Sequence, residues 1–217
     1  MLNRVLPYAA THGLRPLQSF FPDMLWRVEA SERVAYLTFD DGPTSEMTAD
    51  LLDTLARYDA RATCFLIGHH ADHHPSLVRD IHAAGHAIGN HTYTHPDAWT
   101  TPARDVRLQL SNTTMLLEDQ TGAAVDVMRP PYGKFTGPMR TWCAERQQRM
   151  VMWDVMPGDF LDSATATGVA RFVIRNVRPG SIIVLHDNPI CQQVTPSALQ
   201  TILETLTADG WTFEALR

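Results

Sequence analysis

The sequence predicts an α/β fold, built as a (β/α) barrel of about seven parallel strands. Strand-like apolar runs alternate with helix-like segments without a break over residues 34–217, which is the pattern of consecutive βαβ units. The run SIIVL at 181–185 shows no polar alternation, and this suits a strand buried on both faces of a sheet. The sequence contains no GxGxxG after the first strand and no GxxxxGK[ST], so nucleotide-binding folds lose support. The number of repeats favours a closed or nearly closed barrel, and an open doubly wound sheet is the alternative.

The predicted strands are short runs rich in β-branched and aromatic residues, which pack well on a buried pleated surface. In chain order they are VAYLTF (34–39), ATCFLI (62–67), HAIGN (86–90), AVDVM (124–128), RMVMWDV (149–155), SIIVLH (181–186) and a terminal WTFEAL (211–216). Helices between them are predicted from apolar spacing and end signals. Thr44 or Ser45 can cap the first helix, and Gly85 and Gly122 end the second and third. The helical segments are about 44–58, 75–84, 101–120, 138–147, 163–177 and 196–209.

Bulk composition places the chain among ordinary globular proteins. It has 217 residues, 44% of them hydrophobic, and a net charge of −6. No dense Lys/Arg block occurs, so nucleic acid is excluded as the expected partner. No stretch approaches the ~20 consecutive apolar residues of a membrane span. We expect one catalytic domain over 34–217, a flanking segment over 1–33 that packs on the barrel, and a monomer.

The N-terminal segment and the cysteines bear on location and redox state. Apolar runs in residues 1–23 are short and broken by prolines, so the segment does not resemble a secretory signal. This favours a protein that stays in the cytoplasm, unless a leader lies outside this chain. Cys64, Cys143 and Cys191 form no CxxC pair, which argues against a disulfide framework and a thiolate zinc site.

Unusual polar residues gather where the predicted strands end. Every cluster falls at the carboxyl end of a strand, and none falls at an amino end. In a parallel barrel these ends share one face, where active sites are built. The clusters are Asp40 and Asp41, His91 and His95, Arg129, Asp154 and Asp159, and His186 and Asp187.

The residue types in these clusters suit a catalytic metal site. His91 and His95 are four residues apart and can reach one ion from one helical turn or a tight loop, and Pro96 is expected to stop a helix from continuing through His95. Two imidazoles, one carboxylate and an open position describe a catalytic zinc site. Asp40 or Asp41 would be the third ligand. Because consecutive strand residues point to opposite sides, one acid is expected to bind the metal and the other to act as base.

Each cluster also has a plainer interpretation when it is taken alone. DDGP is a common turn sequence, and a HxxxH pair is more often incidental than a metal site. A second histidine group, GHHADHH at 68–74, is expected on a loop or short helix after the second strand. It is interpreted as a solvated surface turn, with an adventitious metal site as the lesser alternative. The aromatic residues Phe20, Phe21 and Trp26 are expected to pack rather than to bind sugar.

Four motifs together resemble the polysaccharide deacetylases of carbohydrate esterase family 4, the NodB homology domain. They are TFDDG (38–42), HTYTH (91–95), RPPY (129–132) and LHD (185–187), and the resemblance covers about residues 34–216. It implies a distorted (β/α) barrel with its active site at the carboxyl ends of about seven strands. It also implies removal of N-acetyl groups from N-acetylglucosamine polymers such as peptidoglycan or chitin-like oligosaccharides.

The resemblance further implies a role for each motif residue. Asp41, His91 and His95 would bind one divalent metal, expected to be zinc, with cobalt or nickel as alternatives. Asp40 would be the general base toward the attacking water, and Arg129 would position it. The Tyr132 backbone N–H would hold the oxyanion. His186 would be the general acid, oriented by Asp159. Leu185 and Trp153 would shape the acetyl pocket.

The fourth motif departs from the family pattern D-x-x-D-W, because the chain has MPGDF at 156–160. Met156 replaces the first acid, and Phe160 replaces the tryptophan and its N–H donor. These changes bear on substrate fit more than on chemistry. Three alternatives to a polysaccharide N-deacetylase remain. They are an O-acetyl esterase, a deacetylase of a small acylated metabolite, and an inactive metal-loaded sugar-binding module. A glycosidase that uses Asp40 and Asp41 is disfavoured, since such a pair must flank the scissile bond.

Overall fold

A single parallel sheet organises the chain, and the computed structural model describes it over residues 7–13 and 15–216. Strands follow the order β1-β6-β5-β4-β3-β2-β7, and β8 pairs with β2 off this path. Every pairing between these strands is parallel, as expected for βαβ connections. The strands are β1 (Met24–Leu25), β2 (Val34–Asp40), β3 (Ala62–Leu66), β4 (Ala87–Asn90), β5 (Val127–Met128), β6 (Arg149–Val151), β7 (Ile182–His186) and β8 (Thr212–Phe213).

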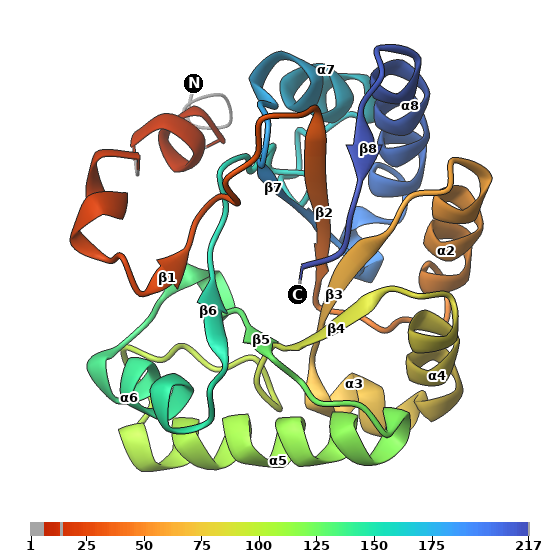
Figure 1. Cartoon of the computed structure of the whole chain (residues 1–217). Coiled ribbons are helices and arrows are strands. Elements are labelled where there is room, and N and C mark those ends of the chain that lie inside the picture. The colour runs from red at the N-terminus through yellow and green to blue at the C-terminus, as the bar shows by residue number, and fades with distance from the viewer. Residues whose placement is uncertain (1–6, 14, 217) are drawn as a thin grey trace.

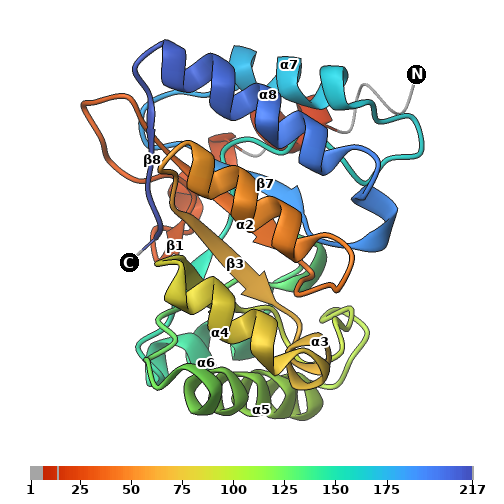
Figure 2. The ribbon, with the colours of Figure 1, turned by 90° about the vertical axis from the view of Figure 1, so that its right-hand side faces the viewer.

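Helices cover the outer face of this curved sheet, so that the view in Figure 1 looks into a ring of strands. Neighbouring helices contact one another in the order α7, α8, α2, α4, α5 and α6. Figure 2 shows α8, α2 and α4 side by side over one flank. The helices are α2 (Thr48–Arg57), α3 (Gly68–His73), α4 (Pro75–Ala83), α5 (Ala103–Thr121), α6 (Gly137–Glu145), α7 (Ala166–Asn176) and α8 (Thr195–Ala208).

The barrel is distorted and closes incompletely between β7 and the β1–β6 edge. Two isolated bridges span this gap, from Arg27 to Ser181 and from Val155 to Ile183. A backbone hydrogen bond from Val28 N–H to the Gly180 carbonyl joins the same edges. The predicted fold class, a distorted barrel of about seven parallel strands, is therefore confirmed.

Two layers of core hold the strands in place. Inside the ring, a small cluster is formed by Phe65, Val127, Val151, Ile182 and Leu216. Outside it, a larger cluster joins the sheet to α2, α4, α7 and α8. Burying each large apolar side chain contributes about 1.5–3 kcal/mol, so both clusters stabilise the strands whose ends carry the site.

Some element boundaries differ from the predicted ones. Residues 24–25 form an edge strand paired with β6, although the sequence marks no strand in the first 33 residues. Residues 1–6 and 14 of that flanking segment lie outside the described residues. The first helix begins at Thr48 rather than near Thr44, because the Thr44 hydroxyl donates to Asp187 Oδ1 instead of capping a helix.

No helix in the described part of the chain is both long and apolar enough to cross a bilayer. The three cysteines are buried and unpaired, in agreement with the prediction that they form no disulfide framework.

Candidate metal centre and active site

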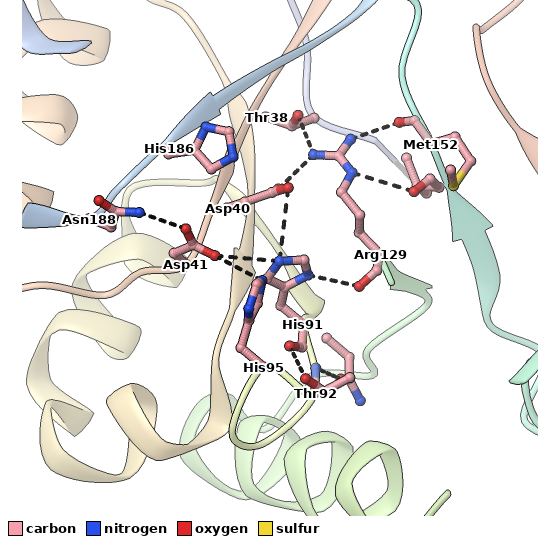
Figure 3. Close-up of polar contacts among 12 residues, drawn as sticks. Thr38, Asp40, Asp41, His91, Thr92, His95, Arg129, Met152, His186 and Asn188 are labelled. Atoms are coloured by element: carbon pink, nitrogen blue, oxygen red, sulfur yellow. Dashed lines mark hydrogen bonds and ion pairs between the residues drawn. The ribbon is translucent and has the colours of Figure 1, made fainter. Parts of the chain in front are cut away.

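The predicted site residues converge at one rim of the barrel, at the carboxyl ends of the strands. Asp40 and His186 are the last residues of β2 and β7, and they are direct partners in the strand register. His91 follows β4, and Arg129 follows β5. Parallel strands bring their carboxyl ends to one edge, so residues almost 150 positions apart meet there. Figure 3 shows this convergence.

Asp41, His91 and His95 form a group that can hold a metal ion. Asp41 Oδ1 lies 3.5 Å from His91 Nε2 and 3.4 Å from His95 Nε2. The three ligand atoms all lie within 4.8 Å of one another. Asp41 Oδ1 is buried and accepts no hydrogen bond from any described residue. A buried carboxylate oxygen without a partner is costly, and a cation between it and two imidazole nitrogens removes that cost. The group therefore fits a divalent metal ion.

Neighbouring groups orient the three candidate ligands. His91 Nδ1–H donates to the Arg129 carbonyl over 2.7 Å, which leaves Nε2 free to face a cation. The Asn188 side-chain amide donates to Asp41 Oδ2 over 2.8 Å. His70 Nδ1–H donates to the Asp41 carbonyl over 2.7 Å. Both donors to Asp41 act on atoms other than Oδ1, so they hold the residue without occupying the ligand atom.

For Asp41 and His95, the electrostatics favour the protonation states that bind metal. Burial alone would raise the pKa of Asp41, but the close polar contact and charge of His91 hold it well below its usual range. Burial and the proximity of His91 lower the pKa of His95 to about 4. At neutral pH these two residues are therefore a carboxylate and a neutral imidazole, the forms in which they ligate metals.

The backbone at this rim is strained. Asp41, Thr92, His95 and Tyr132 have φ values of 77°, 64°, 56° and 58°. Residues other than glycine seldom adopt this left-handed region, and such strain clusters at functional sites. Residues 91–95 form a loop, the second of the two predicted alternatives, and no helix continues through His95, as predicted from Pro96.

Asp40 is paired with Arg129 beneath the metal-binding group. Arg129 Nη1 donates to Asp40 Oδ1 over 2.6 Å. The guanidinium also donates to Thr38 Oγ1 and to the carbonyls of Val151 and Met152, which satisfies it although it is wholly buried. Asp40 Oδ2 remains, 4.0 Å from His91 Nε2. The arginine thus fixes one oxygen of the carboxylate and leaves the other directed at the candidate metal site.

His186 and Asp159 form a second pair on the other side of the site. His186 Nδ1–H donates to Asp159 Oδ1 over 2.8 Å, and the His186 backbone N–H donates to Asp159 Oδ2. The Thr195 hydroxyl also donates to Oδ2, over 2.7 Å. Burial would lower the pKa of His186, but the charge and hydrogen bond of Asp159 raise the pKa to about 9. His186 is therefore a cation at neutral pH, able to donate a proton from Nε2.

A cavity of about 710 Å³ opens over these groups. Trp153 forms part of its wall, packed edge-on against Gly133, where a β-carbon would lie 2.4 Å from the indole. Phe160 contacts the His186 ring nearly at a right angle, with centroids 5.0 Å apart. The remaining apolar walls are Ile67, Tyr132, Met156, Val184 and Ile190.

Leu185 was predicted to shape the acetyl pocket, but it does not line the cavity. It is wholly buried in the cluster between sheet and helices, and the cavity wall from β7 is Val184. Side chains alternate along a strand, so the residue directly before His186 faces away from the cavity that His186 enters.

Asp154 and Asp187 lie at strand ends but support the structure instead of lining the cavity. Arg178 and Ser181 bind Asp154, which is wholly buried. Asp187 accepts hydrogen bonds from the hydroxyls of Thr44 and Thr48, and this fixes the loop that carries Asp41.

The segment 68–74 contains the short helix α3, one of the two forms predicted for it. It is not only a solvated surface segment, because His69 and His70 line the cavity. The sequence does not reveal that His70 belongs to the site, because its hydrogen bond goes to the backbone carbonyl of Asp41 rather than to a carboxylate. Asn188 and Thr195 were also missed. Only Asn188 carries a local signal, as the residue after the LHD motif.

Comparison with known proteins agrees with this geometry. The family model for polysaccharide deacetylases matches residues 27–151. The peptidoglycan-N-acetylglucosamine deacetylase of Bacillus cereus is 36% identical over 181 residues, which cover 83% of this chain and 66% of that protein. The chitooligosaccharide deacetylase of Sinorhizobium fredii is 39% identical over 153 residues, which cover 70% of this chain and 71% of that protein.

A solved structure shares the fold closely. The Bc1960 peptidoglycan N-acetylglucosamine deacetylase superposes with a TM-score of 0.85 at 32% identity, over 89% of this chain and 91% of that one. Sequence and fold thus point to the same group of metal-dependent enzymes. The chain belongs to the polysaccharide deacetylase family, the NodB-like domain of carbohydrate esterase family 4.

Proposed function

We propose that this chain is a metal-dependent hydrolase that removes N-acetyl groups from polysaccharides containing N-acetylglucosamine and releases acetate. One observation carries the proposal. A candidate metal group, a carboxylate fixed by a buried arginine and a histidinium backed by a carboxylate all border one cavity. Family membership and the names of the relatives support the same activity.

Asp41, His91 and His95 would hold the cation, for which we propose zinc because two imidazoles and a carboxylate suit it. A divalent ion bound there would polarise the acetyl carbonyl and lower the pKa of water. Asn188 and His70 would keep Asp41 in place throughout the reaction.

Asp40 would act as the general base. Its Oδ1 is occupied by Arg129, so Oδ2 would take the proton from the attacking water. General base catalysis of this kind is worth about 10²–10⁴-fold in rate. The ion pair with Arg129 also holds this buried carboxylate in place.

His186 would then complete the reaction as the general acid. Water oxygen bonds to the carbonyl carbon, the C–N bond breaks, and His186 Nε2 gives its proton to the departing amine. The Tyr132 backbone N–H, at a strained turn on the cavity wall, would stabilise the oxyanion. Asp159 would hold the imidazole so that Nδ1 stays bonded and Nε2 faces the substrate.

An inactive sugar-binding module is disfavoured, because both the base and the acid are present in a connected geometry. The test is acetate release from N-acetylglucosamine oligomers, from peptidoglycan and from an O-acetylated xylan. It is made on the full chain after chelation and again after zinc is restored. We expect zinc-dependent release from the N-acetylated glycans. Release from the O-acetyl ester alone, or release that chelation does not change, would refute the proposal.

A further inference from the structure

Trp99 is an exposed indole next to the cavity. Its side chain is 68% exposed, whereas Trp26, Trp142 and Trp153 are each less than a tenth exposed. Leaving an indole in water forgoes the stabilisation that burial gives, so an exposed tryptophan is often part of a binding surface. A single exposed apolar residue can also be incidental, and the surroundings of Trp99 therefore decide the matter.

The indole is held in one position by its neighbours. Trp99 Nε1–H donates to the Phe135 carbonyl over 3.2 Å, and the Trp99 backbone N–H donates to Asp97 Oδ1 over 3.0 Å. Lys134, which is ion-paired with Asp97, places Nζ 5.1 Å from the centre of the indole. A ring that is fixed yet exposed is preorganised, so a ligand that stacks on it loses little additional side-chain entropy.

Lys134 also links Trp99 to the cavity wall. Its Nζ lies 5.6 Å from the centre of the Tyr132 ring, and Tyr132 lines the cavity while 63% of it is exposed. Tyr132 in turn packs against His95, with ring centres 4.5 Å apart. Two exposed aromatic rings therefore flank one ammonium group, and this surface continues directly from the candidate metal group.

We propose that Trp99, Lys134 and Tyr132 form a platform that binds a second sugar residue of the glycan, next to the one that is deacetylated. This inference rests on the proposed function. A pyranose has an apolar face of C–H groups and a rim of hydroxyls. The aromatic rings offer stacking surfaces for the face, and the lysine offers to the hydroxyls the N–H donors that its bond to Asp97 leaves free. The chain then prefers oligomers long enough to reach the platform over short ones.

The test compares kcat/KM for acetate release from the hexamer and from the single sugar N-acetylglucosamine, which has no second residue to reach the platform, using the full zinc-loaded chain. We expect Trp99→Ala to lower the hexamer-to-single-sugar ratio about three- to tenfold, the loss of one good stacking contact. Trp99→Phe keeps a ring and should lose less. Leu108→Ala, an exposed apolar residue on α5 that is 58% accessible, is the matched control and should leave the ratio unchanged.

Binding gives a second readout that does not depend on turnover. Titration of the hexamer into the Asp40→Asn protein should show weaker binding when Trp99→Ala is added. Trp99→Leu serves in both assays if Trp99→Ala does not fold. An unchanged ratio and unchanged hexamer affinity in the Trp99 variants would overturn the platform, as would an equal loss in Leu108→Ala. Wild-type protein that releases no acetate from either substrate would instead refute the proposed function.

Discussion

Arg129 and Asp40 form a buried ion pair at the base of the cavity, with Arg129 Nη1 2.6 Å from Asp40 Oδ1. The guanidinium carbon also lies 4.2 Å from the centre of the Phe65 ring, inside the barrel. One side chain thus joins the inner core to the carboxylate that we assign as the base. Stability and activity are therefore linked at this position.

Replacing Arg129 should destabilise the fold strongly. Arg129→Met leaves Asp40 buried without its partner, and breaking a buried pair in this way costs about 3–5 kcal/mol. Urea unfolding of the variant measures the loss. The Asp40→Asn/Arg129→Met double variant is the control, because removing the charge of Asp40 should recover part of the stability. If Arg129→Met costs the same in the wild type as in the Asp40→Asn protein, the two residues do not couple.

The pKa of His186 sets the alkaline limit of activity. The charge of Asp159 raises this pKa to about 9, and only the protonated imidazole can donate to the leaving amine. Activity should therefore fall as pH rises through the pKa of His186. Asp159→Asn removes the charge that raises the pKa, so the alkaline limb of kcat should move to lower pH. A limb that stays in place in Asp159→Asn would contradict the assignment of His186 as the acid.

The fold should lose stability in acid through His86, a buried residue outside the active site. Burial, together with the charge of Arg61, lowers the pKa of His86 to about 4, and its Nδ1 accepts the Ala62 N–H. Between pH 4 and its ordinary value of 6.5, the unfolded chain binds a proton at His86 and the folded chain does not. The free energy of unfolding therefore falls as pH drops through this window, by about 3 kcal/mol at most.

Substitution by a residue that does not titrate isolates this contribution. His86→Gln should be less stable than the wild type at pH 7 but should lose less stability between pH 7 and pH 4.5 in urea unfolding. The same loss over that range in both proteins would show that His86 does not titrate as described.

The fold was predictable where strong local patterns agree with the tertiary structure. The apolar runs that became β2 and β7 mark those strands to within one residue, because both are buried on two faces. β1 could not be predicted, because two residues are too few to show the alternation of a strand. Met24–Leu25 is a strand only because it pairs with β6. The sequence left α3 open as a loop or a short helix, because GHHADH has no apolar stripe.

The site was predictable to the extent that it is carried by charged residues at strand ends. The parallel topology brings those ends together whatever the details of the loops. The supporting contacts could not be predicted, because they join residues far apart in the chain. Asn188 reaches Asp41 across 147 positions, and Thr195 reaches Asp159 across 36. Leu185 was predicted to face the cavity, but its neighbour Val184 does so. The motif does not show which of two adjacent strand residues points inward.

Zinc analysis of purified variants decides whether Asp41, His91 and His95 hold one divalent ion while Asp40 does not bind it. Each variant is loaded with zinc, dialysed and analysed for zinc per folded chain. The wild type, Asp40→Asn and the exposed-histidine control His82→Ala should each retain about one zinc ion. Asp41→Asn, His91→Ala and His95→Ala should each retain much less. Full zinc in His91→Ala or His95→Ala, or an equal loss in Asp40→Asn and Asp41→Asn, would contradict the account.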